Sequence, residues 1–397
     1  MKDAGSAVQE AAFKALDSFR IEIPSWGFAN TGTRFGKFVQ AAAATTIEEK
    51  FADAAEVNKL TGVTPTVALH VLWDVPKGLK DVPEVQALEK RFGVRAGSIN
   101  PNLFQDQQYK YGSLCNPSAE IRQMALDHLL DSIAIGKELE SRDVSLWMAD
   151  GSNYPGTQSI RKRIGWLEEA LGIAHSHLTP AQRLLVEYKP FEPAFYHTDI
   201  ADWGMSSHLA RTAGPQARVL VDTGHHYNAQ NIEQIVAWLL HTGMLGGFHF
   251  NDRRYADDDL TLGSIDPYQI FRIFHEIHAA ADDGLKAEIA YMVDQSHNLK
   301  GKMEAMVQTV MTAQDLYLKA ALVDREKLAG LQETCSLVEA EETFRGAFWN
   351  DVRPLVRAWR EARGLPADPL EALRKSGYVK EAEKARGSRS SAVSSYA

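Results

Sequence analysis

Short apolar runs of strand length recur along the chain, and a longer segment with helical periodicity follows each of them. Eight runs can be recognised, at residues 19–23, 66–73, 94–99, 144–149, 183–189, 218–222, 247–250 and 288–294. The segments between them place apolar residues three and four positions apart, as amphipathic helices do. The clearest are residues 46–60, 119–139, 232–244 and 268–282. Strands that alternate with helices pair in parallel through crossovers. Eight such units predict an α/β protein with a (β/α)8 TIM barrel.

The predicted barrel occupies residues 1–298 and begins with an N-terminal helix. From residue 299 to residue 385 the pattern stays helical, which is more chain than the last barrel helix needs. We expect this C-terminal helical extension to cover the barrel or to contact a neighbouring subunit. Residues 386–397 are small and polar, and this composition predicts a disordered tail.

Composition excludes several classes of protein. The 397 residues include 52 acidic and 43 basic side chains, a formal charge of -9, which argues against a nucleic-acid binder that neutralises phosphates. A small neutral partner or a cation fits better. Two cysteines are too few for a disulfide framework, so a reducing cytoplasm is the expected location. No run approaches 18 uninterrupted apolar residues, so we expect no membrane span and no export signal.

Ionisable residues end the last four predicted strands. Glu187, Asp222 and Asp294 come at the ends of three of them, and His249 lies between two phenylalanines in the fourth. The two-residue period of a strand turns His249 toward the barrel interior and both phenylalanines outward. Because the carboxyl ends of barrel strands meet at one mouth, these four side chains are expected to converge there.

Clustered buried carboxylates repel one another unless a cation holds them together. Three oxygens and one imidazole nitrogen suit manganese, cobalt or zinc better than calcium. Asp257 and Asp259 follow the strand that ends near residue 250, and in an extended segment both would point the same way. Together with His225 they could form a second site, although periodicity does not separate His225 from His226. Asp222 is placed to bridge the two sites.

Other residues near strand ends have both a structural and a functional interpretation. Lys189 shares a strand face with the carboxylate two residues before it, so it should also reach the mouth. His70 with Asp74 could be an oriented acid and base pair or a structural hydrogen bond. Trp26, Phe104 and Trp147 could be core residues or the apolar wall of a sugar pocket. No glycine-rich nucleotide fingerprint, P-loop or nucleophile elbow is present.

Several motifs, in order along the chain, carry a resemblance to a known family. They are IPSWG, TGTRF, LHVLWD, YKYGSL, DGSNYPG, EYKPFEPAFY, LVDTGHH, GGFHFND, DDDL and DQSHN. The sequence resembles bacterial L-rhamnose isomerase of the broad-specificity type, within the xylose-isomerase-like barrel enzymes. The resemblance implies a (β/α)8 barrel, a homotetramer and two divalent ions per subunit, most often Mn²⁺, with Co²⁺ or Zn²⁺ as alternatives. It also implies interconversion of L-rhamnose and L-rhamnulose, and of rarer sugars such as D-allose and D-psicose.

The resemblance also implies roles for single residues. It assigns one metal site to Glu187, Asp222, His249 and Asp294, and the catalytic one to His225, Asp257 and Asp259. It makes Lys189 and His70 catalytic and substrate-binding residues, with Lys189 stabilising charge at O1 and His70 assisting ring opening. The pocket walls would be Trp26, Phe104 and Trp147, and Phe35 would extend into the pocket of an adjacent subunit.

Two other activities are compatible with a metal-containing barrel. A metal-dependent hydrolase of phosphodiesters would need a basic path for its substrate, and no basic run lies near the candidate ligands. A sugar 3-epimerase would need two carboxylates facing each other across one metal, whereas His225 and the Asp257 and Asp259 pair indicate a second ion. An aldose–ketose isomerase in carbohydrate metabolism is therefore the favoured hypothesis.

Overall fold

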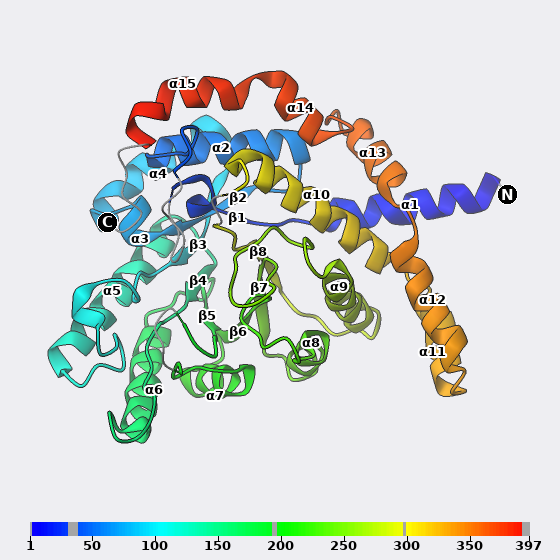
Figure 1. Cartoon of the computed structure of the whole chain (residues 1–397). Helices are drawn as coiled ribbons and strands as arrows, with labels where there is room; N and C mark the ends of the chain where they lie inside the picture. The colour runs from blue at the N-terminus through cyan, green and yellow to red at the C-terminus, as the bar shows by residue number, and fades with distance from the viewer. Residues whose placement is uncertain (1, 31–38, 193–196, 297–298, 391–397) are drawn as a thin grey trace.

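Eight parallel strands form one sheet in the order β1 to β8, with helices around it (Figure 1). The computed structural model describes residues 2–30, 39–192, 197–296 and 299–390. The strands are β1 (Ile23–Pro24), β2 (Thr66–His70), β3 (Arg95–Asn100), β4 (Asp143–Leu146), β5 (Arg183–Glu187), β6 (Ala217–Asp222), β7 (Leu245–Phe250) and β8 (Ala290–Val293). Glu22 closes the barrel, since its N–H donates to the Tyr291 carbonyl at 2.8 Å and its carbonyl accepts from Val293 at 2.9 Å. The (β/α)8 prediction is confirmed.

Several strands are shorter than their predicted ranges, and the first two show why. The run at 19–23 becomes regular strand only at Ile23, although Phe19 and Ile21 before it are buried. The run at 66–73 ends as a strand at His70 and continues as the one-turn helix α3 (Val71–Asp74). The Asp74 carboxylate accepts from the His70 N–H at 2.8 Å, and this local bond ends the strand. The expected strand over 71–73 is therefore wrong.

The helices around the barrel follow the predicted alternation. The longer ones are α1 (Lys2–Ser18), α2 (Ile47–Thr61), α4 (Val82–Phe92), α5 (Ala119–Glu138), α6 (Ile160–Ser176), α7 (Trp203–Ala213), α8 (Ile232–His241), α9 (Pro267–Asp282) and α10 (Lys302–Ala321). Three short 3-10 turns, η1 (Ser25–Phe28), η2 (Gly78–Asp81) and η3 (Gln107–Tyr109), lie in the connections. Side-chain caps start several helices, as Thr46 does for α2 and Asp202 for α7.

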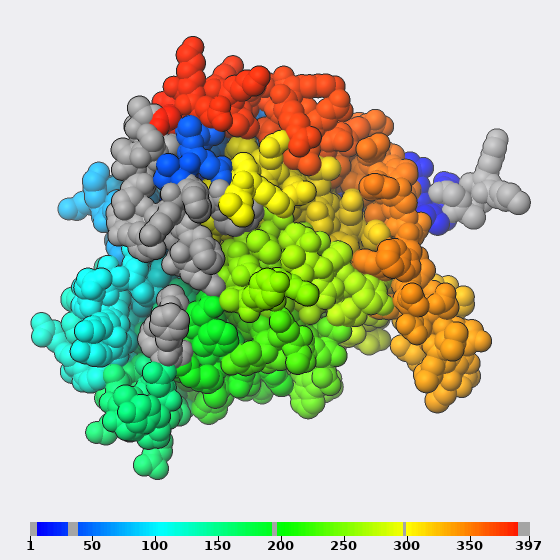
Figure 2. Space-filling view, viewed as in Figure 1, coloured from blue at the N-terminus to red at the C-terminus, as the bar shows by residue number. Residues whose placement is uncertain are grey.

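Five helices follow α10 and form the C-terminal extension. They are α11 (Arg325–Glu333), α12 (Leu337–Trp349), α13 (Arg353–Ala362), α14 (Pro369–Ser376) and α15 (Tyr378–Ser390). The chain from α13 to α15 runs across α1, α10 and α2, so the extension returns to the part of the barrel that the first elements of the chain form (Figure 1). Figure 2 shows it as a continuous band over the top and side of the molecule, with α11 and α12 projecting outward.

The tail boundary expected at residue 386 is too early. Arg386 lies in α15 and is buried, and its guanidinium donates to both oxygens of Asp53 on α2, at 2.8 and 2.9 Å. The Tyr378 hydroxyl donates to the same carboxylate at 2.6 Å. Small polar residues predict disorder, but one buried ion pair to a distant helix orders this segment.

The strand faces alternate as the sequence pattern predicts. Phe248 and Phe250 on β7 stack against each other outside the barrel, with ring centroids 4.8 Å apart. The barrel interior contains a small apolar layer, which consists of Leu185, Leu220, Ala290 and Met292. This layer fills the barrel below the mouth, so the polar residues at the carboxyl ends of β5 to β8 are accessible only from the mouth. Within the described residues, no helix is long and apolar enough to cross a membrane.

Candidate active site

A pocket opens at the carboxyl ends of the strands and divides into a charged and an aromatic side. It encloses about 70 Å³ and is lined by Trp26, His70, Trp73, Asn100, Pro101, Phe104, Ser145, Trp147, Glu187, Lys189, His225, His249, Asp257, Asp259, Asp294 and Ser296. Most described residues that the sequence marks as site candidates line it. The exceptions are Asp222, Asp74 and His226, which are buried but do not line the pocket. Phe35 lies outside the described residues.

Strands β5, β6 and β7 bring three ligand-type side chains together. Ligand atoms of Glu187, Asp222 and His249 all lie within 4.8 Å of one another. The Nδ1 atom of His249 is 3.2 Å from Glu187 and 3.9 Å from Asp222. Neither nitrogen of this buried ring makes a hydrogen bond within the described chain. A buried imidazole with two unsatisfied nitrogens, facing carboxylates, has the donor chemistry of a metal ligand.

A second group shares Asp222 with the first. Ligand atoms of Asp222, His225 and Asp257 also lie within 4.8 Å of one another. The Nδ1 atom of His225 bonds the Tyr188 carbonyl at 3.0 Å, so its proton belongs there. The Nε2 atom then faces Asp257 at 3.3 Å and Asp222 at 3.9 Å. With the Nδ1 proton bonded to the Tyr188 carbonyl, Nε2 is the ring atom directed at two carboxylates, and it can bind a cation when the cation displaces its own proton.

The two histidines that the sequence pattern leaves open have different surroundings. The Nε2 atom of His226 forms a hydrogen bond with the Tyr188 hydroxyl at 2.6 Å, on the outer side of β5. Burial lowers the pKa of His226 to about 3, so its ring is neutral. It lies outside both close groups, whereas His225 lies within one. The geometry therefore separates them where periodicity could not.

Burial and neighbouring charges shift the pKa values of the carboxyl groups and imidazoles in both groups. Burial raises the pKa of Asp222 to about 7, although His225 opposes this shift. Burial disfavours charge on both histidines, but the carboxylates outweigh it, so that Asp222 and Asp257 raise the pKa of His225 to about 9. Glu187 likewise raises the pKa of His249 to about 10. Protons on the histidines thus balance part of the acidic charge, a task that a divalent cation performs more completely.

Asp294 and Asp259 line the pocket beside these groups. The Trp26 indole N–H donates to Asp294 at 2.8 Å, and burial raises the pKa of this carboxyl. Asp259 accepts from the Ser296 hydroxyl at 2.8 Å. Asp259 has a φ of 48°, so the segment from Asp257 is not extended there, and that assumption was wrong. A left-handed residue nevertheless turns both aspartates to the same cavity.

Lys189 lies between the two sides of the pocket. Its ammonium is 2.6 Å from Asp257 and 3.5 Å from Glu192. It also lies 5.3 Å from the centre of the Trp147 ring, within cation–π range. The lysine is buried, so these contacts hold its charge at the edge of the carboxylate groups.

The aromatic side consists of rings in mutual contact. His70 packs between Trp26 and Trp73, with centroids 4.6 and 4.3 Å away, and Phe104 packs on Trp147 at 4.8 Å. Sequence reasoning missed Trp73. A strand over 66–73 would place positions 70 and 73 on opposite faces, whereas the turn of α3 places them on one side. The signal was the local Asp74, which can end a strand by bonding backbone.

Asp74 bonds the backbone of His70 and not its ring, so of the two predicted interpretations the structural hydrogen bond is confirmed and the acid and base pair is wrong. Its carboxylate accepts from the Ser25 hydroxyl at 2.6 Å, from the His70 backbone at 2.8 Å and from the buried Lys50 ammonium at 2.5 Å. These bonds attach the turn that carries Trp26 to the turn that carries His70. Burial lowers the pKa of His70 to about 3, so its imidazole is neutral.

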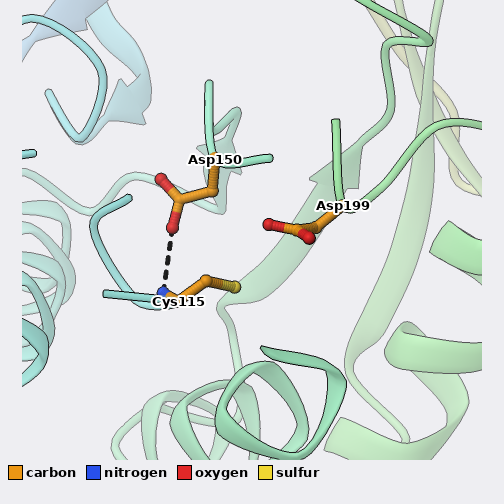
Figure 3. A group of neighbouring side chains, drawn as sticks. All are labelled: Cys115, Asp150 and Asp199. Atoms are coloured by element: carbon orange, nitrogen blue, oxygen red, sulfur yellow. Dashed lines mark hydrogen bonds between the residues drawn. The ribbon is translucent and has the colours of Figure 1, made fainter. Parts of the chain in front are cut away.

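A third close group of ligand types has a structural explanation. Cys115, Asp150 and Asp199 approach one another beneath the loops after β3, β4 and β5 (Figure 3). The fully buried Arg163 bonds Asp199 through Nε at 3.0 Å, and backbone N–H groups of Ser113 and Cys115 donate to Asp150. Burial raises the pKa of the Cys115 thiol, so it is not a thiolate ligand. Arg163 supplies the positive charge that a metal would.

Fold and site together define a (β/α)8-barrel enzyme, and comparison with known proteins identifies its family. No family model matches the chain. A probable sugar isomerase of Mesorhizobium japonicum is 38% identical over 369 residues, which span 91% of this chain and 85% of the relative. One from Rhizobium meliloti is 37% identical over 93% of this chain and 86% of its own length. The chain belongs to this sugar isomerase family.

More distant matches agree on the fold. The xylose isomerase of Thermus thermophilus is 27% identical over 182 residues, 43% of this chain and 46% of that protein. A xylose isomerase domain protein from Alicyclobacillus acidocaldarius has a TM-score of 0.52 at 15% identity, covering 77% of this chain and 99% of its own. A D-allulose 3-epimerase from Methylomonas sp. has a TM-score of 0.51 at 14% identity, covering 75% and 94%. These structures share the barrel.

Proposed function

We propose that this isomerase is a metal-dependent aldose–ketose isomerase that interconverts L-rhamnose and L-rhamnulose. We extend the proposal to rarer pairs such as D-allose and D-psicose. One observation carries it: two carboxylate and histidine groups share Asp222 on one side of a pocket whose other side is aromatic. An aromatic face packs against the carbon skeleton of a sugar, while charged groups act on its oxygens.

The residues present fit two divalent cations. The Nδ1 atom of His249 faces Glu187 and Asp222, and the Nε2 atom of His225 faces Asp257 and Asp222. We assign one ion to Glu187, Asp222, His249 and Asp294, and the other to His225, Asp257 and Asp259 with Asp222 between them. Mixed oxygen and nitrogen donors favour Mn²⁺, with Co²⁺ or Zn²⁺ as alternatives.

Isomerisation of an open-chain aldose moves one hydrogen from C2 to C1 and one proton from O2 to O1. Bound cations supply Lewis acidity that polarises the oxygens on those carbons. Lys189 adds a fixed positive charge near the same oxygens, since Asp257 and the Trp147 ring hold its ammonium in place. We assign it the stabilisation of negative charge that develops at O1.

His70 contributes a neutral imidazole on the aromatic side. With a pKa of about 3 it carries no proton to donate as an imidazolium at neutral pH. We assign it to ring opening as a neutral imidazole, which hydrogen-bonds the anomeric hydroxyl and passes that proton on to the ring oxygen, so that no net proton is gained or lost. Trp26, Phe104 and Trp147 shape the pocket around it and bind the apolar face of the sugar.

We also propose a homotetramer in which Phe35 of an adjacent subunit completes the pocket. Light scattering tests the assembly, and a Phe35→Ala variant tests the contribution of that side chain to KM. A monomer with full activity would contradict this part of the proposal while leaving the chemistry in place.

The decisive test is a screen of aldoses and ketoses with Mn²⁺-supplied enzyme, followed by identification of the products by NMR. We expect L-rhamnulose from L-rhamnose, and loss of activity after chelation that Mn²⁺ restores. An Asp257→Ala/Asp259→Ala variant should lose activity too. Activity that survives chelation would refute the metal requirement. Inversion at C3 alone would instead indicate a 3-epimerase, and cleavage of a phosphodiester a hydrolase.

The route of the hydrogen is a separate question with its own experiment. A hydride shift brings in no solvent deuterium at C1 or C2, whereas proton transfer through an enediol does. Product formed in D₂O, analysed by NMR, distinguishes the two.

A further inference from the structure

A second cavity lies next to the sugar pocket. It encloses about 110 Å³ and is lined by Lys189, Pro190, Phe191, Glu192, Gly224, His225, His226, Tyr227, Asn228, Tyr255, Ala256 and Asp257. It shares only Lys189, His225 and Asp257 with the sugar pocket. These shared residues include two members of the Asp222, His225 and Asp257 group. The second cavity, here called the side cavity, therefore reaches the same group as the sugar pocket, next to which it lies.

The partition between the two cavities is polar. It is the ion pair of Lys189 with Asp257, at 2.6 Å, and both side chains are buried. On the side-cavity face, Glu192 approaches the same ammonium at 3.5 Å. Glu192 has a φ of 87°, a backbone conformation that few residues other than glycine adopt, and this directs the loop after β5. A partition made of charges on flexible side chains can open without unpacking an apolar core.

The two cavities offer different paths to a hydrated cation. Aromatic rings form one side of the sugar pocket, and bound sugar would fill it. The side cavity has space for several water molecules, since each needs about 10–15 Å³. Glu192 and Asp257 give it two carboxylates, which face the ammonium of Lys189 and the imidazole of His225. Its rim includes the exposed Tyr255 and Tyr227, so it opens to solvent.

We propose that the side cavity is the entrance through which water and hydrated divalent cations reach the Asp222, His225 and Asp257 group. Glu192 attracts the cation at this entrance, and displacement of the Lys189 ammonium from Asp257 lets it pass. The sugar pocket then serves the sugar alone. This inference rests on the proposed function, because it assumes that the group holds a metal ion.

A reversible obstruction tests the entrance within one folded protein. Cys335 is exposed and Cys115 is buried, so a Cys335→Ser background leaves no reactive native thiol among the described cysteines. Ala256→Cys in that background is loaded with Co²⁺, labelled or not with a bulky maleimide, and mixed with EDTA while cobalt absorption is followed. Labelling should slow release of the faster-exchanging ion by about fivefold or more. A Phe104→Cys variant labelled on the sugar side should release Co²⁺ at its unlabelled rate.

The reverse pattern, slow release only from labelled Phe104→Cys, would overturn the inference. Cobalt content is measured before mixing, which distinguishes this failure from failure of the proposed function. Two ions bound with equal release rates in all samples would refute the entrance alone. Absence of bound Co²⁺ would refute the metal sites and the entrance together.

A charge variant tests the role of Glu192. Glu192→Gln should slow Co²⁺ association about twofold or more at low ionic strength, with a smaller difference at high salt. Glu288→Gln is the matched control, because it removes one carboxylate on the opposite, N-terminal face of the barrel. Equal association rates for the two variants at low salt would contradict the assignment to Glu192.

Discussion

The two sides of the pocket are built differently. On the side of β5 to β8, most functional groups lie on the strand ends or within three residues of them, as Glu187 and Asp222 do, whereas Asp257 and Asp259 lie in the loop after β7. On the side of β1 to β4, they stand in turns beyond the strands, as Trp26 does in η1 and Trp73 in α3. The sheet itself directs most of the charged groups, whereas separate hydrogen bonds must position the aromatic rings.

The two sides also differ in how their buried polar groups are satisfied. Asp74 behind the aromatic rings has a cation and two hydrogen-bond donors within 2.8 Å. In the charged half, His249 makes no hydrogen bond to a described residue, and Asp222 has a raised pKa although it accepts from the Gly224 N–H and the Asn251 amide. A satisfied network rigidifies its surroundings, and an unsatisfied one has capacity left for a ligand. The structure thus separates a prearranged wall from a site with room for cations.

The largest effect is expected from the carboxylate that both metal groups share. Asp222→Asn should reduce kcat/KM by about 10³-fold or more, because loss of Lewis acidity worth several kcal/mol raises the barrier. Metal analysis should find fewer than the two ions of the parent. His226→Gln changes a neighbouring buried histidine outside both groups and should retain both ions. Two ions bound by Asp222→Asn would refute the shared-ligand assignment.

The next effect tests whether Asp74 holds the aromatic half together. Asp74→Ala leaves the Lys50 ammonium buried without its carboxylate, which should cost about 3–5 kcal/mol in the free energy of unfolding. Adding Lys50→Met should recover part of that loss. In the double variant KM should stay raised while kcat falls less, because the turns carrying Trp26 and His70 remain unlinked. Chemical denaturation and steady-state kinetics measure both, and parental KM in the double variant would contradict a positioning role.

Stability of the charged half should depend on pH and on metal. His225 and His249 have folded pKa values of about 9 and 10, above the ordinary 6.5, so the folded state keeps protons that the unfolded chain releases. The stability they contribute is complete below pH 6.5 and is lost as pH rises toward 9. Each such proton is worth about 1.4 kcal/mol per pH unit.

Divalent cations replace those protons, so their stabilising effect should grow over the same pH window. Melting curves at pH 7 and pH 8.5, with and without Mn²⁺, should show a larger Mn²⁺-induced rise in Tm at the higher pH. Equal rises at both values would contradict the assignment of the histidines as ligands. The same comparison in Asp222→Asn should show a smaller rise.

The smallest effect concerns the ring that sequence reasoning missed. Trp73→Phe should raise KM for the sugar by about threefold to tenfold, since an aromatic contact contributes about 0.5–1.5 kcal/mol. Trp238→Phe removes the same atoms from a half-exposed position on α8 and should leave KM unchanged. Equal KM values in the two variants would remove Trp73 from the sugar-binding wall.

Residues on the strands could be predicted from the sequence, whereas the arrangement of residues in the turns and loops could not. Glu187, His249 and Lys189 could be placed because the two-residue period of a strand fixes the direction of each side chain. The role of Asp74 could not be predicted, because its main partner Lys50 comes from a helix that local spacing does not relate to it. The orientation at Asp259 escaped prediction as well, since a left-handed φ leaves no periodic signal.

The sequence by itself determined the alternation of strands and helices, and with it the barrel and the mouth where Glu187, Asp222 and His249 converge. These features follow from the periods of apolar and polar residues, which are local and readable. Residue spacing left His225 and His226 open, and only the family resemblance favoured His225. The tertiary structure showed that His225 lines the pocket, that Asp74 binds Lys50, and that a side cavity lies next to Lys189. These features depend on contacts between elements that are far apart in the sequence, and no local pattern of residues specifies how close such elements come.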